Sequence, residues 1–320
     1  MDLRCYGLTS PRHDGKVSVH FADINNYKHE WEIDELPWDA VVPIPNGEVH
    51  PDTLDQRVVD AIKARALPPE DKMPPKTHAA AIAFLYLYMM MTSGGSRSVL
   101  RGHICGYMVS EADRIRNRPS FHFVCRSSLP IGAGLGSSAS FSVCIATALL
   151  ILHGRIELPA VPPPSREATD NDPGHIHVSH GGRRAIPPNI AEETNRWAFV
   201  AEKVLHGNPS GVDNSVAVFG GALAYVRPGF GKRSGMDQIQ GFKSLRFLLI
   251  DSKVPRDTKA LVAGVARKKV AEPESVGKLL DAIQVISNEA RRALADPEVP
   301  RNVLLAGLSV RCSDVSLVNF

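Results

Sequence analysis

The stretch 79–91 limits the possible folds of this chain most strongly, because its apolar residues do not keep to one side of a helix. Thr77 can begin a helix here, and Gly94 and Gly95 can end it. A helix that is apolar all round has no face suited to water, so it must be surrounded by protein. The stretch is also too short to cross a bilayer, which needs roughly 20 residues. The sequence therefore predicts a buried central helix.

Composition predicts a globular, cytoplasmic protein. The 320 residues are 43% hydrophobic and 22% charged, which suffices for one large domain or two moderate ones. The net charge is +3 and the basic residues are scattered, which argues against a nucleic-acid partner. The first 15 residues are polar and do not form a signal peptide, and we expect no membrane partner. The cysteine number is odd and no C-x-x-C pair occurs, which argues against disulfides or a zinc site. The cysteines are Cys5, Cys105, Cys125, Cys144 and Cys312.

Alternating and helical patterns follow one another along the chain. The expected strands are 16–33, which forms two strands joined around Asn25 and Asn26, and then 121–125, 222–226 and 245–251. The expected helices are 53–66, 138–153, 189–205, 258–269 and 276–294. Thr53 would cap the first of these helices, and Asn189 would cap the third. The segment 159–188 is rich in Pro, Gly and charged residues, and we expect a flexible surface loop there. Its His175, His177 and His180 could bind a metal, but a solvated loop is the favoured interpretation because nothing would hold the imidazoles in place.

A glycine-rich turn over 130–139, with the sequence PIGAGLGSSA, joins the strand at 121–125 to the following helix. Alternate glycines let a backbone approach a ligand closely, and a helix N-terminus attracts phosphate. The turn lacks the Gly-Lys-Ser/Thr of a Walker A loop and the spacing of a Rossmann fingerprint. The alternative is an ordinary strand–helix turn with a serine cap. The residues concerned are Gly132, Ala133, Gly134, Leu135, Gly136, Ser137 and Ser138.

A second turn-rich segment over 206–214, HGNPSGVDN, contains Asp213. An aspartate in such a setting often bonds only to its own backbone. Alternatively, the flanking turns hold its carboxylate at a cleft, where it accepts a proton from a substrate hydroxyl as a general base. The residues alone leave both interpretations open.

These segments resemble a known family. The stretch 130–139 resembles the phosphate motif of the GHMP kinases, named for galactokinase, homoserine kinase, mevalonate kinase and phosphomevalonate kinase. Within that family, 206–214, 83–88 (AFLYLY) and 253–265 (KVPRDTKALVAGV) are similar to mevalonate kinases. The resemblance covers roughly residues 2–294. It implies an α+β fold of two domains, with mixed sheets, helices packed on them and the active site between the domains. The expected domains are an ATP-binding N-terminal domain, 1–222, and a partial C-terminal domain, 223–320.

The resemblance also implies roles for individual residues. The loop from Gly132 to Ser138 would hold the phosphates of ATP, and Ser138 and Glu202 would hold Mg²⁺. The base would be Asp213. The other implied contacts are Ser127 and Asp23 with the nucleotide, and Thr258, Leu205 and Phe141 with mevalonate. For Glu202 the alternative is an exposed acid at a helix end, and for Leu205 and Phe141 it is core packing.

Two family motifs have no counterpart here. Mevalonate kinases begin with Ala-Pro-Gly-Lys followed by Gly-Glu-His, and that lysine lies beside the catalytic aspartate. Lys16 is a hairpin-turn residue and no replacement. The second glycine-rich loop of the family is also missing, and the residues after 295 show no resemblance, so we expect an incomplete C-terminal domain.

Two functions follow from these expectations. The first is ATP-dependent phosphorylation of mevalonate to 5-phosphomevalonate, in isoprenoid and sterol biosynthesis. One alternative is a catalytically inactive truncated relative or splice product that binds nucleotide without turnover, and another is an incomplete product that does not fold stably. The family often dimerises, so a homodimer is a further expectation.

Overall fold

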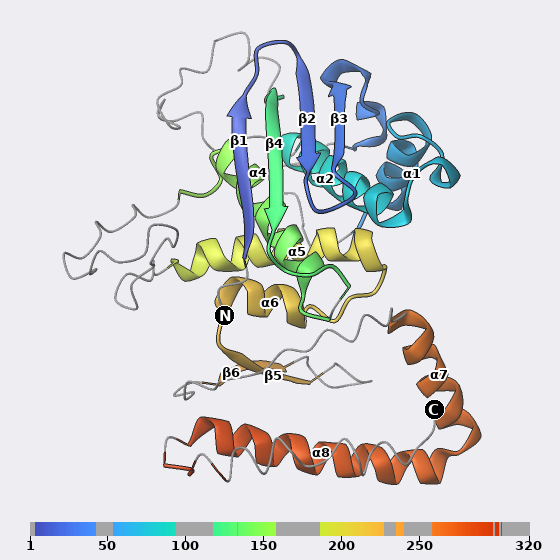
Figure 1. Ribbon diagram of the computed structural model, residues 1–320, viewed down its shortest axis with the longest axis vertical. Helices are drawn as coiled ribbons and strands as arrows, with labels where there is room; N and C mark the ends of the chain where they lie inside the picture. The colour runs from blue at the N-terminus through green and yellow to red at the C-terminus, as the bar shows by residue number, and fades with distance from the viewer. Residues whose placement is uncertain are drawn as a thin grey trace, which may run out of the picture. The chain divides into compact units, whose positions relative to one another are not determined.

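The computed structural model describes residues 4–42, 54–93, 118–132, 134–157, 186–226, 235–239, 258–296, 298–300 and 302. It has the predicted α+β architecture, with helices packed on a mixed sheet (Figure 1). The chain forms two compact units. The first contains 1–131 and 136–218, and the second contains 132–135 and 219–320. The expected domain division after residue 222 stays a prediction.

The first unit is built on a four-stranded sheet. Its strands are β1 (Cys5–Pro11), β2 (Lys16–Phe21), β3 (Tyr27–Glu32) and β4 (Phe121–Ser127), in the order β1-β4-β2-β3. The central pair, β2 and β4, is parallel, while β1–β4 and β2–β3 are antiparallel. The turn between β2 and β3 lies where the sequence predicted it. Asn25 and Asn26 adopt φ angles of 53° and 49°, a left-handed conformation that asparagine tolerates better than most residues.

Within the described ranges of the first unit, five helices accompany this sheet. They are α1 (Gln56–Arg65), α2 (Pro75–Ser93), α4 (Ser137–Leu152), α5 (Pro188–His206) and α6 (Val212–Phe219), with short 3-10 turns at Ile33–Glu35, Trp38–Ala40 and Glu70–Lys72. Helices α2 and α4 lie against the sheet, and α5 packs on both of them (Figure 1). This arrangement brings the start of α4 and the end of α5 together with the turn before α6.

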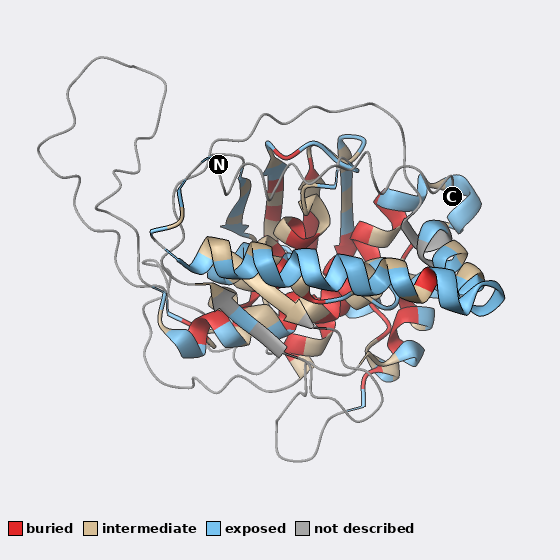
Figure 2. Ribbon diagram, turned by 90° about the horizontal axis from the view of Figure 1, so that it is seen from below, coloured by how far each residue is buried: buried red, intermediate tan, exposed pale blue. Residues whose placement is uncertain are grey.

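The predicted buried helix is α2. Leu85 and Leu87 are fully buried, as the all-round apolar pattern required. The Phe84 ring contacts five other aromatic rings of the unit: Phe21, Trp31, Tyr88, Phe121 and Phe123. Figure 2 shows buried residues on the sheet and on the helices beside it. The core therefore lies between the sheet and α2.

Three helix starts differ from the sequence prediction. Asp55, and not Thr53, caps α1 by accepting a hydrogen bond from the backbone N–H of Arg57. Helix α2 begins at Pro75, so Thr77 lies inside its first turn, where its hydroxyl accepts from Asn25. Helix α5 begins at Pro188, and not after Asn189, because proline lacks an N–H and suits the first helical turn.

The described parts of the second unit are a hairpin and two helices. Strands β5 (Ala222–Val226) and β6 (Gly235–Ile239) pair antiparallel, and α7 (Thr258–Ala271) precedes α8 (Pro273–Ala295). The sequence predicted β5 and both helices but missed β6. The expected strand at 245–251, most of the expected loop at 159–188 with its histidines, and nearly all of the tail lie outside the described residues. None of the helices in the described ranges has the length and apolar character needed to span a membrane.

Candidate active site

The glycine-rich turn leads into α4 with the backbone conformation that its sequence requires. Gly132, Gly134 and Gly136 have φ angles of 82°, 75° and 70°, a region that residues with a Cβ rarely adopt. Gly136 itself is the N-cap of α4, and no side chain caps the helix. The serine cap considered above is therefore wrong. The first-turn N–H groups of a 16-residue helix remain for another acceptor, and the N-terminus favours an anion.

Ser138 and Glu202 meet beside this helix start. The Ser138 hydroxyl donates to Glu202 Oε2 at 3.4 Å, although the two residues are 64 positions apart. Ser142, one turn further along α4, donates to Glu202 Oε1 at 2.9 Å. His206 Nε2 lies 3.1 Å from Ser138 Oγ and 3.8 Å from Glu202 Oε2. Two residues of α4 and one further residue of α5 therefore converge on the Glu202 carboxylate.

Glu202 is buried, with only 3% of its surface exposed, and is not the exposed helix-end acid considered as the alternative. Burial raises the pKa of its carboxyl group, and the negative charge of Asp213 acts in the same direction. The Ser142 hydrogen bond, the His206 charge and the Ser138 hydrogen bond oppose the shift. A buried carboxylate whose charge is costly is stabilised by a cation. Carboxylate and hydroxyl oxygens are ligands that suit Mg²⁺, so this donor set fits that ion.

Asp213 lies in the first turn of α6, next to the start of α4. A Cβ added at Gly136 would lie 3.8 Å from the Asp213 Cβ. The start of α6 is held to α5 and to the turn before it, because Asn214 donates to Asn195 and Ser215 donates to the Gly211 carbonyl, both at 2.7 Å. The Asp213 side chain itself is exposed. Its carboxylate is therefore accessible to solvent beside the glycine-rich turn.

Asp23 and Ser127 also lie together, at the ends of the parallel strands β2 and β4. The Ser127 backbone N–H donates to Asp23 Oδ2 at 2.6 Å, and the Ser127 hydroxyl accepts from the Leu129 N–H at 3.1 Å. These bonds hold the end of β4 in place. Among the described residues, no hydrogen bond or ion pair links this pair to Ser138 or Glu202. Their expected contact with nucleotide stays a prediction.

The three residues expected to contact mevalonate are less informative. Phe141 is 6% exposed and its ring lies 5.0 Å from that of Phe21. Leu205 is partly buried against the same core, so both residues fit the packing alternative. Thr258 is the first residue of α7 and belongs to the second unit, and its side chain is outside the described set, as is Ala133 of the turn.

Sequence reasoning missed two members of the cluster, Ser142 and His206. Both have a detectable signal, because each lies four residues after a predicted ligand in the same helix. Residues at i and i+4 share one helix face. Ser142 follows Ser138 and His206 follows Glu202 at this spacing.

Comparison with known proteins shows what this chain is similar to in sequence. Residues 103–161 match the GHMP kinases N terminal domain. The chain is 35% identical over 296 residues to the mevalonate kinase of Mus musculus, covering 92% of this chain and 63% of that protein. It is 33% identical over 305 residues to the mevalonate kinase of Candida albicans, covering 93% of this chain and 61% of that protein. It is 35% identical over 296 residues to the mevalonate kinase of Homo sapiens, covering 92% of this chain and 63% of that protein. The chain thus spans somewhat less than two thirds of the length of these relatives. The chain is therefore similar to mevalonate kinases over most of its own length, and residues 103–161, which include the glycine-rich turn that opens α4, match the N-terminal domain of the GHMP kinases.

Proposed function

We propose that this chain binds Mg·ATP at the start of α4 and transfers the γ-phosphate to the C5 hydroxyl of mevalonate. The observation that carries the proposal is the convergence of Ser138, Glu202 and Asp213 beside the glycine-rich turn. The substrate is taken from the relatives, which are named as mevalonate kinases. A cytoplasmic location and a homodimer stay predictions.

The phosphates would be bound by the backbone N–H groups at the start of α4. The left-handed glycines bring that backbone close to a ligand, and the helix N-terminus favours negative charge. Ser138 and Glu202 would hold Mg²⁺ through a hydroxyl and a carboxylate oxygen. When bound, this ion neutralises charge that develops on the phosphate oxygens.

Asp213 would then act on the second substrate. Its carboxylate takes the proton of the attacking hydroxyl, the hydroxyl oxygen bonds to the γ-phosphorus, and the bond to the β-phosphate oxygen breaks to release ADP. Ser142 and His206 would be positioning residues, since they hold Glu202 rather than the substrate. Phosphoryl transfer depends chiefly on positioning and charge stabilisation, which such a set can supply.

The direct test is a coupled assay that follows ADP release from the purified chain given Mg·ATP and mevalonate. Mevalonate-dependent ADP release would support the proposal, with a reaction lacking mevalonate as the blank. Binding of Mg·ATP in calorimetry without any mevalonate-dependent release would favour the alternative, a relative that holds nucleotide without turnover. Absence of both binding and release would contradict the phosphate site itself.

Replacing Glu202 by glutamine is expected to remove the stabilisation that Mg²⁺ adds to ATP binding. At a ligand concentration of 100 times Kd, binding raises the free energy of unfolding by about 2.7 kcal/mol. We expect this gain for the parent with Mg·ATP and a clear reduction of it in Glu202→Gln. When a chelator in excess removes Mg²⁺, ATP should stabilise the parent and Glu202→Gln to a similar extent. Thermal unfolding measured with each ligand reports the difference.

A matched control is available on the same helix. Glu192 is exposed on α5, and Glu192→Gln should keep the full response to Mg·ATP. Equal responses to Mg·ATP in Glu202→Gln and Glu192→Gln would show that Glu202 does not hold the ion.

A further inference from the structure

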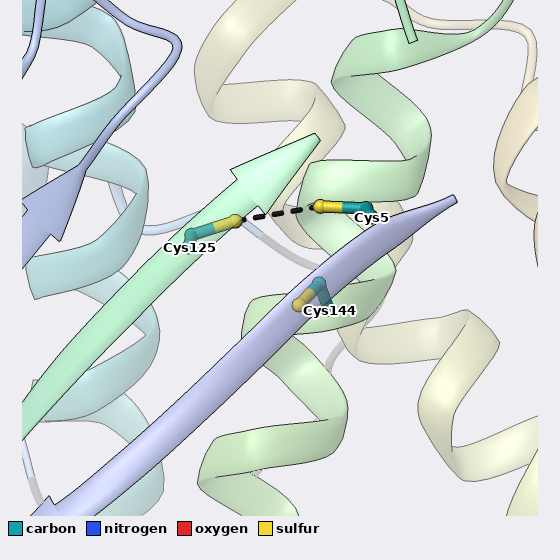
Figure 3. A group of neighbouring side chains, drawn as sticks. All are labelled: Cys5, Cys125 and Cys144. Carbon is teal, nitrogen blue, oxygen red and sulfur yellow. Dashed lines mark hydrogen bonds between the residues drawn. The ribbon is translucent and has the colours of Figure 1, made fainter. Parts of the chain in front are cut away.

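Three cysteines from distant parts of the chain lie together in the first unit. Cys5 opens β1, Cys125 lies in β4, and Cys144 lies in α4 (Figure 3). Their sulfur atoms are all within 4.8 Å of one another, and the Cys5 and Cys125 sulfurs are 3.4 Å apart. Cys125 is buried, while Cys5 and Cys144 are partly exposed. The cluster therefore combines one buried thiol with two that are partly exposed.

The strand register and one glycine bring these sulfurs together. In the β1–β4 pair, Cys5 lies opposite Ser127 and Gly7 lies opposite Cys125. Residues two apart in a strand share a face, so Cys5 and Gly7 both face α4. A Cβ at Gly7 would lie 2.7 Å from the Cys144 sulfur, which is too close for any side chain. The absence of a side chain at Gly7 therefore makes room for the third thiol.

A disulfide between Cys5 and Cys125 does not suit this register. The two residues are diagonal neighbours, and diagonal pairs are typically about 7–8 Å apart across a sheet. A disulfide needs Cα atoms no more than about 7 Å apart and Cβ atoms about 3.5–4.5 Å apart. Forming the bond would therefore require the paired backbone to move. It would also leave Cys144 without a role.

A single metal ion suits the same three sulfurs better. With a Zn–S distance of about 2.3 Å, two sulfurs of one ion can be at most about 4.6 Å apart. The separations found here need only small side-chain rotations to reach that range. Thiolates are soft ligands that select Zn²⁺ or Cu⁺ over hard cations such as Mg²⁺. The cluster therefore differs in ligand chemistry from the Ser138–Glu202 pair.

Electrostatics inside the cluster are compatible with metal binding. Hydrogen bonds from Cys125 and Cys5 lower the pKa of the Cys144 thiol to about 4. The same interaction with Cys144 raises the pKa of Cys125. Cysteine binds metal ions as a thiolate, so metal binding at this cluster would release protons.

We propose that Cys5, Cys125 and Cys144 form a binding site for one thiophilic cation, of the Zn²⁺ or Cu⁺ class, between β1, β4 and α4. The three-sulfur geometry leaves a further coordination position for water or another ligand. This site ties the first strand of the chain to the helix that opens at the glycine-rich turn.

The test uses Zn²⁺ and Co²⁺ with the full chain carrying Cys105→Ser and Cys312→Ser, which leaves only the cluster cysteines. We expect one equivalent of Zn²⁺ in competition with a chromogenic chelator. Co²⁺ should give sulfur-to-cobalt charge-transfer absorption, a signal that histidine sites do not produce. Cys5→Ser, Cys125→Ser and Cys144→Ser should each weaken Zn²⁺ binding at least about 100-fold, because even the loss of an outer-shell partner commonly costs about 10–100-fold.

Tryptophan fluorescence, compared among all variants, reports whether each one folds, since all three tryptophans lie in the first unit. Two results would overturn the proposal. One is a cobalt charge-transfer band that stays unchanged in each of the folded single variants Cys5→Ser, Cys125→Ser and Cys144→Ser. The other is a parent that takes up no Zn²⁺ or Cu⁺ under reducing conditions. Zinc that raises the melting temperature of the parent, but not of Cys144→Ser, would support it.

Discussion

Replacing Asp213 by asparagine is expected to lower kcat about 10²- to 10⁴-fold, the usual contribution of a general base. Asparagine keeps the size and the turn-forming ability of aspartate but cannot accept the hydroxyl proton. The Asp213 carboxylate is exposed, and within the described part of the chain it makes no hydrogen bond or ion pair that supports the fold. Folding should therefore be unchanged in Asp213→Asn. ATP binding should also be nearly intact, because the base acts on the hydroxyl and not on the nucleotide.

The measurement is mevalonate-dependent ADP release beside calorimetric ATP binding. Asp60→Asn is the matched control, because Asp60 is an exposed aspartate on α1 in the same unit. We expect Asp60→Asn to behave as the parent in both measurements. An Asp213→Asn variant that turns over near the parent rate would remove Asp213 from the mechanism. A variant that loses ATP binding and turnover together would assign Asp213 to the nucleotide site instead.

Replacing Phe84 by alanine is expected to cost about 3–5 kcal/mol of stability, the range for a fully buried phenylalanine. The Phe84 ring is wholly buried and contacts rings from β2, β3, β4 and α2 itself, so its removal leaves a cavity that the rigid sheet cannot readily close. A domain is commonly stable by only about 5–15 kcal/mol, so this loss is a large fraction of the total.

Urea unfolding followed by tryptophan fluorescence measures this loss for the first unit alone. Trp31, Trp38 and Trp197 are the only tryptophans of the chain, and all belong to that unit. Tyr6→Ala is the comparison, because the Tyr6 ring is 54% exposed on β1 and should cost far less. A Phe84→Ala loss no larger than that of Tyr6→Ala would mean that α2 is not the centre of the core.

Local patterns were enough to predict much of the fold. The all-round apolar stretch identified the buried helix, and alternate glycines identified the turn before α4, because both features act over a few neighbouring residues. The turn-rich segment indicated the turn before Asp213 but not helix α6, which begins at Val212 and contains this residue. The family resemblance supplied Glu202, whose burial no local pattern indicated.

The cysteine cluster could not be predicted in this way. Cys5 and Cys125 are 120 residues apart, and they meet only through the register of β1 on β4. A one-residue change of register would place one of the two on the opposite face of the sheet. C-x-x-C spacing identifies only metal ligands that are neighbours in sequence. The absence of such pairs therefore excludes a local zinc motif but not a site built from distant cysteines.

The parallel pairing of β2 with β4 has a consequence for synthesis of the chain. Val17 pairs with Phe121, and the two strands are separated by 104 residues at each paired position. At about 5–20 residues per second, β4 leaves the ribosome roughly 5–20 s after β2. During that interval β1 has no strand to pair with, and the β2–β3 hairpin exposes an edge that a neighbouring nascent chain could occupy. We therefore expect the yield of folded protein to depend on how quickly residues 33–120 are translated and on chaperones that cover this edge.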